Sequence, residues 1–145
     1  MRRIVIDASV AVKWVFPDDP AEPNVRQALA LLDDIGKGRA EPVQPPHWLA
    51  EVAAVVSRLG PGVASDAVLL LHAMDFSVAA GPEIYRRAVE LSVDLGHHVS
   101  DTLYHAVALC SGDAELVTAD DRYFRKAARR GGISRLAEYG KSAPG

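Results

Sequence analysis

The feature that most constrains the fold is a short apolar run at residues 3–6, which ends at Asp7. After Arg3 its residues are all apolar and β-branched, without the alternation of a strand that has one face in water. Such a strand is typical of a parallel sheet that is covered on both faces. A helical apolar pattern begins at Ala8 and stops at the PDDP segment, residues 17–20, so we predict a buried strand followed directly by a helix.

The rest of the chain repeats this alternation of apolar runs and amphipathic segments. Helical periodicity, often with proline near the start or glycine at the end, predicts helices over residues 24–38, 46–60, 63–74, 82–96, 100–112 and 120–131. Short apolar runs predict strands or extended pieces over residues 40–45, 75–80, 114–118 and 133–136. The alternation predicts an α/β fold with a short, mainly parallel sheet between helical layers. A length of 145 residues predicts a single domain over residues 1–145.

Composition argues against several other classes of protein. Apolar residues make up 49% of the chain and charged residues 24%, which is ordinary globular usage and argues against disorder or a fibre. No apolar run reaches membrane-spanning length, and the first run stops at Asp7 too early for a signal peptide. Because Cys110 is the single cysteine, an internal disulfide is impossible. We therefore expect a cytoplasmic location and no membrane association.

Carboxylates follow two of the predicted strands. Asp7 follows the first strand, and Asp120 and Asp121 follow the strand at 114–118. Because sites in parallel sheets form beyond the carboxyl ends of strands, these acids are candidates for one shared site. Each also has an ordinary explanation, since Asp7 and Asp120 precede helices and can cap them, and Asp101 in a first helical turn complements the helix dipole.

Glu51 has no such explanation. Its predicted helix is apolar nearly all round, and Trp48 and Val55 flank Glu51 on its own face. We expect that helix to be largely buried, and glutamate is rarely buried without a partner. A ligand role is favoured over a buried ion pair with an arginine.

If the four acids converge, their repulsion has to be relieved. Two unit charges about 4 Å apart cost roughly 4 kcal/mol at an effective dielectric constant of 20, so either some acids are protonated or a divalent cation lies among them. All-oxygen sites select Mg²⁺ or Mn²⁺ over zinc. Such an ion activates water and stabilises phosphate oxygens, which is the chemistry of phosphodiester cleavage. The acids concerned are Asp7, Glu51, Asp101 and Asp120.

Four segments together resemble a known family. IVIDASVAVKWVF, the glutamate of PPHWLAEVAAVV, SDTLYHAVAL and LVTADDRYFRKA are similar, in order, to the four acidic signatures of PIN-domain ribonucleases. The resemblance extends from Ile4 to about Leu136 and is closest to VapC-type toxins of toxin–antitoxin pairs. It implies a PIN-like three-layer α/β/α sandwich and an Mg²⁺- or Mn²⁺-dependent endoribonuclease that acts as a toxin.

The resemblance also assigns roles to residues. Its acidic, metal-binding cluster consists of Asp7, Glu51, Asp101 and Asp120. Ser9 and Thr118 match polar positions that support those acids, and Asp121 is an alternative to Asp120 or a water-mediated helper. The resemblance further implies a cognate VapB-type antitoxin and a homodimer. The aromatic residues Trp14, Phe16 and Trp48 either line an antitoxin groove or belong to the core.

Basic residues crowd one segment of an otherwise acidic chain of net charge −3. They either bind RNA phosphates near Asp120 or form a solvated helix face. The candidates for RNA binding are Arg122, Arg125, Lys126 and Arg129. The histidines at 97, 98 and 105 lack the further ligands of a zinc site, and we expect Cys110 to be packed inertly in its helix.

Two alternative functions stay open. An aspartate-based phosphatase or phosphotransfer domain also carries an acid after its first strand. However, haloacid-dehalogenase-like phosphatases have a second aspartate where this chain has Ser9. Receiver domains have a lysine after a late strand, where this chain has ADD. The other alternative is a non-catalytic PIN-like binding module, in which the acids serve only as helix caps and buried ion pairs.

Overall fold

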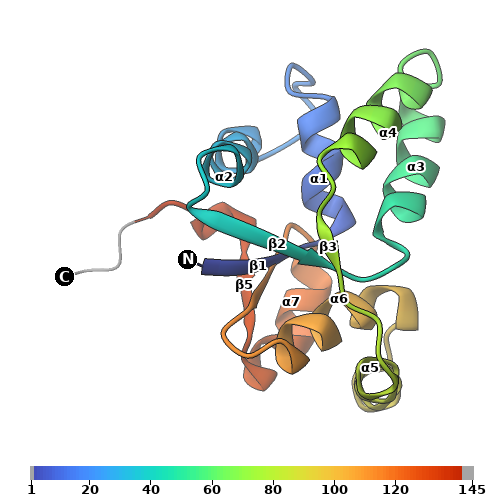
Figure 1. Cartoon of the computed structure of the whole chain (residues 1–145), viewed down its shortest axis with the longest axis vertical. Coiled ribbons are helices and arrows are strands. Elements are labelled where there is room, and N and C mark those ends of the chain that lie inside the picture. Colours follow the sequence, from blue (N-terminus) through green and yellow to red (C-terminus); the bar gives the residue numbers. More distant parts are fainter. Residues whose placement is uncertain (1, 142–145) are drawn as a thin grey trace.

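The central element of the fold is a five-stranded sheet (Figure 1). The computed structural model describes residues 2–141 of the chain. The strands are β1 (Arg2–Ile6), β2 (Ala40–Gln44), β3 (Ser77–Val78), β4 (Glu115–Thr118) and β5 (Ile133–Arg135). They lie in the order β3-β2-β1-β4-β5, and every neighbouring pair is parallel. The predicted α/β class with a short parallel sheet is confirmed.

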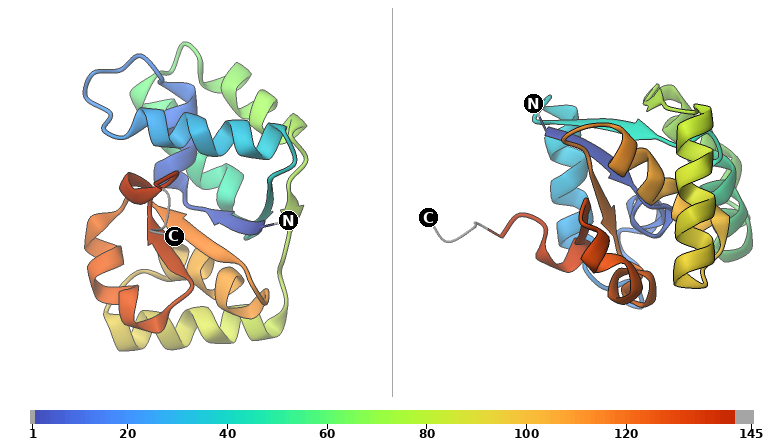
Figure 2. Two further views of the ribbon diagram at one scale, coloured as in Figure 1. Left: turned by 90° about the vertical axis from the view of Figure 1, so that its left-hand side faces the viewer. Right: turned by 90° about the horizontal axis from the view of Figure 1, so that it is seen from below.

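Helices cover both faces of this sheet. They are α1 (Ala8–Val15), α2 (Val25–Gly36), α3 (Trp48–Leu59), α4 (Ala64–Ala73), α5 (Pro82–Leu95), α6 (Val99–Cys110) and α7 (Asp121–Ala127). As Figures 1 and 2 show, α1 to α4 lie on one face and α5 to α7 on the other. The predicted three-layer arrangement is thus confirmed. No helix within residues 2–141 has the length and apolar character needed to cross a membrane.

The strand order places a switch point between β1 and β4. From β1 the chain moves outward through β2 to β3, and it then returns to the other side of β1 to form β4 and β5. The helix that follows β1 therefore lies on one face of the sheet and the helix that follows β4 lies on the other. The loops that leave these two strands run in opposite directions and open a crevice at their carboxyl ends. Asp7 and Asp120 follow these two strands, and the Asp7 amide donates to the Val117 carbonyl at 3.1 Å.

The apolar pattern of the first strand has the expected structural result. Ile4, Val5 and Ile6 are at most 1% exposed, because β1 is the central strand of a sheet that helices cover on both faces. Helix α6 is the most deeply buried helix in the described chain, since all residues from Thr102 to Ala108 are buried. Its first turn still reaches the edge of the sheet, and there it carries Asp101.

The expectation that α3 is buried nearly all round is wrong. Its buried residues form one stripe of Trp48, Val52 and Val56, which have the four-residue spacing of a single helix face. Ala50 and Ala54 are exposed, because short side chains leave part of this apolar sequence facing solvent. Glu51 lies beside the buried stripe rather than within a closed core.

Three smaller expectations also change. The predicted strand at 75–80 is reduced to Ser77–Val78, and the helix expected over 120–131 changes to a 3₁₀ turn at Ala128–Arg130. Gly131, with φ of 74°, ends that turn in a backbone conformation that glycine adopts without strain. Cys110 is exposed rather than packed, since it lies in the last turn of α6.

Candidate functional site

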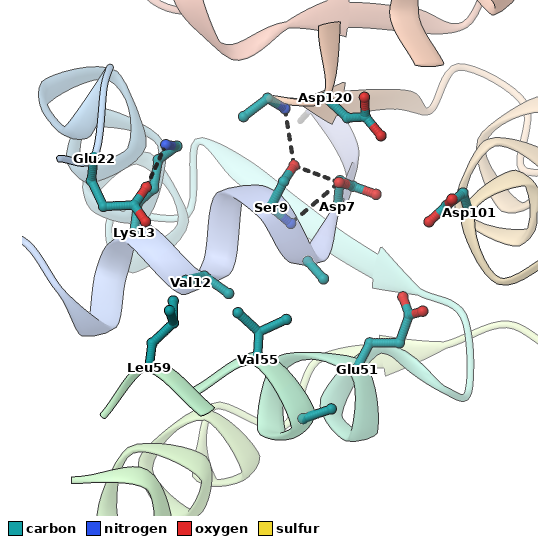
Figure 3. Close-up of a pocket in the computed structure, with 13 residues that line it drawn as sticks. Asp7, Ser9, Val12, Lys13, Glu22, Glu51, Val55, Leu59, Asp101 and Asp120 are labelled. Atoms are coloured by element: carbon teal, nitrogen blue, oxygen red, sulfur yellow. Dashed lines mark hydrogen bonds and ion pairs between the residues drawn. The ribbon is translucent and has the colours of Figure 1, made fainter. Parts of the chain in front are cut away.

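The four acids of the sequence prediction line one pocket at the carboxyl edge of the sheet (Figure 3). The pocket has a volume of about 520 Å³. Asp7 and Asp120 come from the ends of β1 and β4, and Glu51 and Asp101 come from the first turns of α3 and α6. The remaining lining residues are Ala8, Ser9, Val12, Lys13, Glu22, Ala54, Val55, Leu59 and Ala119. Tertiary structure therefore brings together acids that are separated by up to 113 residues in sequence.

Asp7 is both a helix cap and a pocket acid. Its Oδ2 accepts hydrogen bonds from the Ser9 amide at 3.2 Å, the Ser9 hydroxyl at 2.5 Å and the Thr118 hydroxyl at 3.4 Å. Burial raises the pKa of Asp7 to about 6, and the charges of Asp101 and Asp120 add to the rise, although the Ser9 hydrogen bonds oppose it. Because the donors converge on Oδ2, Oδ1 is left for the pocket.

Ser9 and Thr118 connect the ends of β1 and β4. The Ser9 hydroxyl donates to Asp7 and accepts from the Ala119 amide at 3.1 Å. The Thr118 hydroxyl donates to Asp7 and accepts from the Asp120 amide at 3.0 Å. Both hydroxyls therefore fix the spacing of the two strand-end acids, and we refer to these contacts as the hydroxyl bridge.

Asp120, and not Asp121, faces the pocket. Asp120 caps α7, since its Oδ1 accepts from the Tyr123 amide at 3.0 Å, and its side chain also lines the pocket. Asp121 is 61% exposed and pairs with Arg135 at 3.2 Å. The geometry favours Asp120 as the acid that acts with Asp7, and capping uses only one of its oxygens.

Asp101 is held by a histidine. His97 Nε2 lies 3.2 Å from Asp101 Oδ2, and Lys126 Nζ lies 3.2 Å from His97 Nδ1. Because an ammonium can only donate, Nδ1 of His97 is the acceptor from Lys126, and Nε2 is the ring nitrogen that faces Asp101. Lys126 also donates to the Gly96 carbonyl at 3.0 Å. From the sequence, His97 is weighed only as a zinc ligand, although its spacing of four residues from Asp101 is a signal for this contact.

Glu51 lies on the opposite wall of the pocket, on α3 (Figure 3). It is 28% exposed, and its Oε1 lies 3.4 Å from Nε2 of His47. The partner is thus a histidine rather than the arginine considered from the sequence. Burial raises the pKa of Glu51, and the charge of Asp101 adds to this effect.

The chemistry of these donors fits a hard divalent cation. Carboxylate oxygens are the preferred protein ligands of Mg²⁺, and the raised pKa of Asp7 reflects burial together with the charges of neighbouring acids. Within residues 2–141, however, no three His, Cys, Asp or Glu side chains are close enough as arranged to hold one ion. Side-chain rotation is therefore required to bring several of these carboxylates onto the same cation.

The predicted RNA-binding residues lie outside the pocket lining. Arg122, Arg125 and Arg129 are exposed on α7 and the turn that follows it, whereas Lys126 is bound to Gly96 and His97. Their role in RNA binding stays a prediction.

The candidate groove aromatics pack largely in the interior. Trp48 stacks on Phe76 with ring centroids 5.4 Å apart, and Trp14 meets the same ring edge-on at 6.5 Å. The Trp14 indole donates to the Ala28 carbonyl at 2.8 Å, and Phe16 packs against the core. These contacts favour the core interpretation over the groove interpretation.

The fold and the pocket define a class: a doubly wound α/β domain with carboxylates gathered at the switch point of a parallel sheet. A family model described as PIN domain matches residues 4–130, and the chain therefore belongs to the PIN domain family. PIN domains generally have metal-dependent nuclease activity and usually bind Mg²⁺ or Mn²⁺.

A solved structure supports the fold. The chain is similar to PAE2754 from Pyrobaculum aerophilum, known from a crystal structure, with 20% sequence identity and a TM-score of 0.64. The match covers 94% of this chain and 90% of that chain. At this identity the likeness shows the fold alone. Comparison with curated proteins finds no match.

Proposed function

We propose that this chain is an Mg²⁺- or Mn²⁺-dependent endoribonuclease that hydrolyses RNA phosphodiester bonds as the toxin of a toxin–antitoxin pair. The observation that carries the enzymatic part is the convergence of four carboxylates, from two strand ends and two helix starts, on one pocket. The resemblance of the four acidic segments to VapC-type toxins supports the biological role.

The chain's own residues position the acids for this reaction. The hydroxyl bridge holds Asp7 Oδ2 and directs Oδ1 to the pocket, and His97 holds one oxygen of Asp101. Asp7, Asp101 and Asp120 are the residues that would hold the cation, with Glu51 facing them across the pocket. A bound Mg²⁺ or Mn²⁺ lowers the pKa of water and neutralises charge on the phosphate.

Proton transfer is assigned to Glu51. Hydrolysis adds the hydroxyl of water to phosphorus and breaks one P–O bond, and the remaining proton of that water ends on the leaving oxygen. The proton therefore needs an acceptor that can carry it from the attacking water. Glu51 faces the other three acids across the pocket (Figure 3), and burial raises its pKa. A carboxylate with a raised pKa is a better base than an ordinary one.

The test is cleavage of total RNA by purified protein with Mg²⁺. Asp7→Asn and Asp101→Asn should each lower the rate at least about a hundredfold, as expected for loss of a preorganised charged group. Asp121→Asn, next to the site but outside the pocket, is the matched control and should retain activity. Undiminished cleavage by Asp7→Asn would refute the proposal. When each variant is expressed in cells, the variants that cleave RNA more slowly should also arrest growth less.

Partner binding and location are proposed on the same resemblance. We expect a small VapB-type antitoxin encoded by a neighbouring reading frame, a homodimer, and a cytoplasmic location. Co-expression with that reading frame followed by affinity purification tests the first expectation. Light scattering of the purified chain tests the second, and cell fractionation tests the third.

A further inference from the structure

Lys13 lies in the acidic pocket but has no part in the chemistry described above. It is the single cation among the pocket-lining residues, and its side chain is only 4% exposed. Its ammonium donates to Glu22 Oε2 at 2.8 Å. Figure 3 shows this pair at the end of the pocket away from Asp101 and Glu51.

Stability alone is a weak reason for such a pair. The cost of removing two charges from water offsets much of their attraction, so buried ion pairs contribute little net stability. An ammonium also has three hydrogens to donate, and the described residues give Lys13 one acceptor, Glu22. Two donor positions thus remain for a ligand with several acceptor oxygens.

The position of Lys13 on α1 suggests which ligand this is. Lys13 follows Ser9 by four residues, so both lie on the same face of the helix. Four residues advance the helix axis by about 6 Å, which is close to the spacing of neighbouring phosphates along a nucleic-acid strand. The backbone position that carries Lys13 therefore lies about one phosphate spacing beyond the position that carries Ser9.

Charge balance points the same way. The other ionisable residues of the pocket lining are carboxylates, namely Asp7, Glu22, Glu51, Asp101 and Asp120. An RNA strand that enters this pocket meets repulsion at every phosphate that no cation neutralises. A divalent cation would neutralise charge among the acids at one end of the pocket, and Lys13 is the cationic side chain at the other end.

We propose that Lys13 binds the phosphate next to the scissile one, and that Glu22 is an internal competitor that occupies the ammonium until RNA displaces it. The inference rests on the proposed ribonuclease function. It makes Lys13 a positioning residue and Glu22 an autoinhibitory one.

The segment that carries Glu22 can release it at small cost. Residues 17–21 are exposed, between α1 and α2. The Glu22 amide donates to the Asp19 carbonyl at 3.0 Å, and the Ala21 amide donates to Asp19 Oδ1 at 2.9 Å. Because these bonds are made within the segment, Glu22 can turn away from Lys13 without breaking a contact to the sheet.

The test compares Lys13→Met, Lys13→Arg and Glu22→Gln with a matched pair outside the pocket. Lys37 and Asp33 form that pair at 2.9 Å, both more than half exposed, and are changed to Met and Asn. Binding of a labelled single-stranded RNA of random sequence is followed by anisotropy with Mg²⁺, from about 50 to 200 mM salt, in a cleavage-deficient Asp120→Asn background. KM and kcat for the same RNA are measured without that background substitution.

Opposite effects are expected from the two members of the pair. Lys13→Met should weaken RNA binding about threefold to tenfold and lower the salt slope by about 0.7, the value for one phosphate of a single strand. Glu22→Gln should tighten binding about threefold, because the competing ion pair is gone. Lys13→Arg should keep the slope. KM should follow these changes with kcat nearly constant, and the Lys37 and Asp33 variants should leave the slope unchanged.

A purely structural pair gives a different pattern. If Lys13→Met and Glu22→Gln weaken binding alike, with matching losses of thermal stability, or if Lys13→Met leaves the salt slope unchanged, the proposal is overturned. A wild-type chain that neither binds nor cleaves RNA overturns the ribonuclease function itself. The two failures are therefore distinguishable.

Discussion

Replacing Asp7 by asparagine should stabilise the metal-free protein while it abolishes cleavage. The pKa of Asp7 is raised from 3.8 to about 6, chiefly by burial. This corresponds to about 3 kcal/mol of free energy that disfavours the ionised side chain in the folded state. Asparagine has the same shape and no charge. Its amide oxygen can accept the Ser9 and Thr118 hydrogen bonds in place of Oδ2, and its NH₂ group then faces the neighbouring carboxylates.

The figure of about 3 kcal/mol is an upper bound, because part of Asp7 is exposed to the pocket and water there reduces the penalty. We expect a gain of about 1 to 3 kcal/mol at pH 7, or about 3 to 9 °C in Tm for a chain of this length. Since the folded pKa is the higher one, the stability linked to Asp7 is complete below pH 3.8 and is lost as pH rises towards 6. The advantage of asparagine should therefore fall below about 1 kcal/mol at pH 4.

Urea unfolding in EDTA at several pH values measures this difference. Asp121→Asn is the control, because its exposed side chain should change stability by no more than about 0.5 kcal/mol. In Mg²⁺ the difference in unfolding free energy between the variant and the wild type should shrink or change sign. A cation that binds the folded state stabilises the wild type more than the variant. An asparagine variant that is no more stable at pH 7, or whose advantage does not shrink on acidification, would refute the reasoning.

Three further predictions concern groups around the site and in the core. His97→Phe removes the imidazole that contacts the pocket acid of α6 and should lower Mn²⁺ affinity about tenfold by calorimetry, as is common for partners of metal ligands. Burial lowers the pKa of His105 below its ordinary value of 6.5. The stability linked to the neutral ring is therefore present above that pH and is lost on acidification, because the unfolded state takes up the proton first. In urea unfolding, the free energy of unfolding of His105→Gln should fall less steeply between pH 7 and 5 than that of the wild type. Gly60→Ala would place a Cβ 2.7 Å from the Phe16 ring and should cost about 1 to 3 kcal/mol, whereas Gly62→Ala, with open space around it, should cost less in the same thermal melts.

Local patterns explain why the fold could be predicted from sequence. The run that ends at Asp7 is consecutively apolar from Ile4, and in the AELVT segment Glu115 is the one charged residue, at the exposed start of its strand. A strand buried on both faces favours such a pattern. Both strands are found, adjacent and parallel. The acids placed after them meet because the carboxyl ends of parallel strands share one edge. That inference needed topology but no side-chain detail.

For Glu51, the sequence predicts a position in the pocket correctly but predicts its burial wrongly. It was expected in a dry core, yet it is 28% exposed on a pocket wall. Apolar composition does not distinguish a buried helix from one that shows alanines to solvent. His97 and Lys13 were not assigned these positions, because their roles depend on partners that tertiary structure supplies, such as Lys126, which lies 29 residues from His97.

The hydroxyl bridge has a consequence for the order in which the molecule is made. It joins Asp7 and Ser9 to Thr118 and Ala119, so one half of the bridge leaves the ribosome long before the other is translated. A growing chain therefore carries Asp7 without the strand that completes the site until residues 115–118 have been translated. The four-acid pocket is thereby assembled only after Asp120, the last of its acids in the sequence, has been translated.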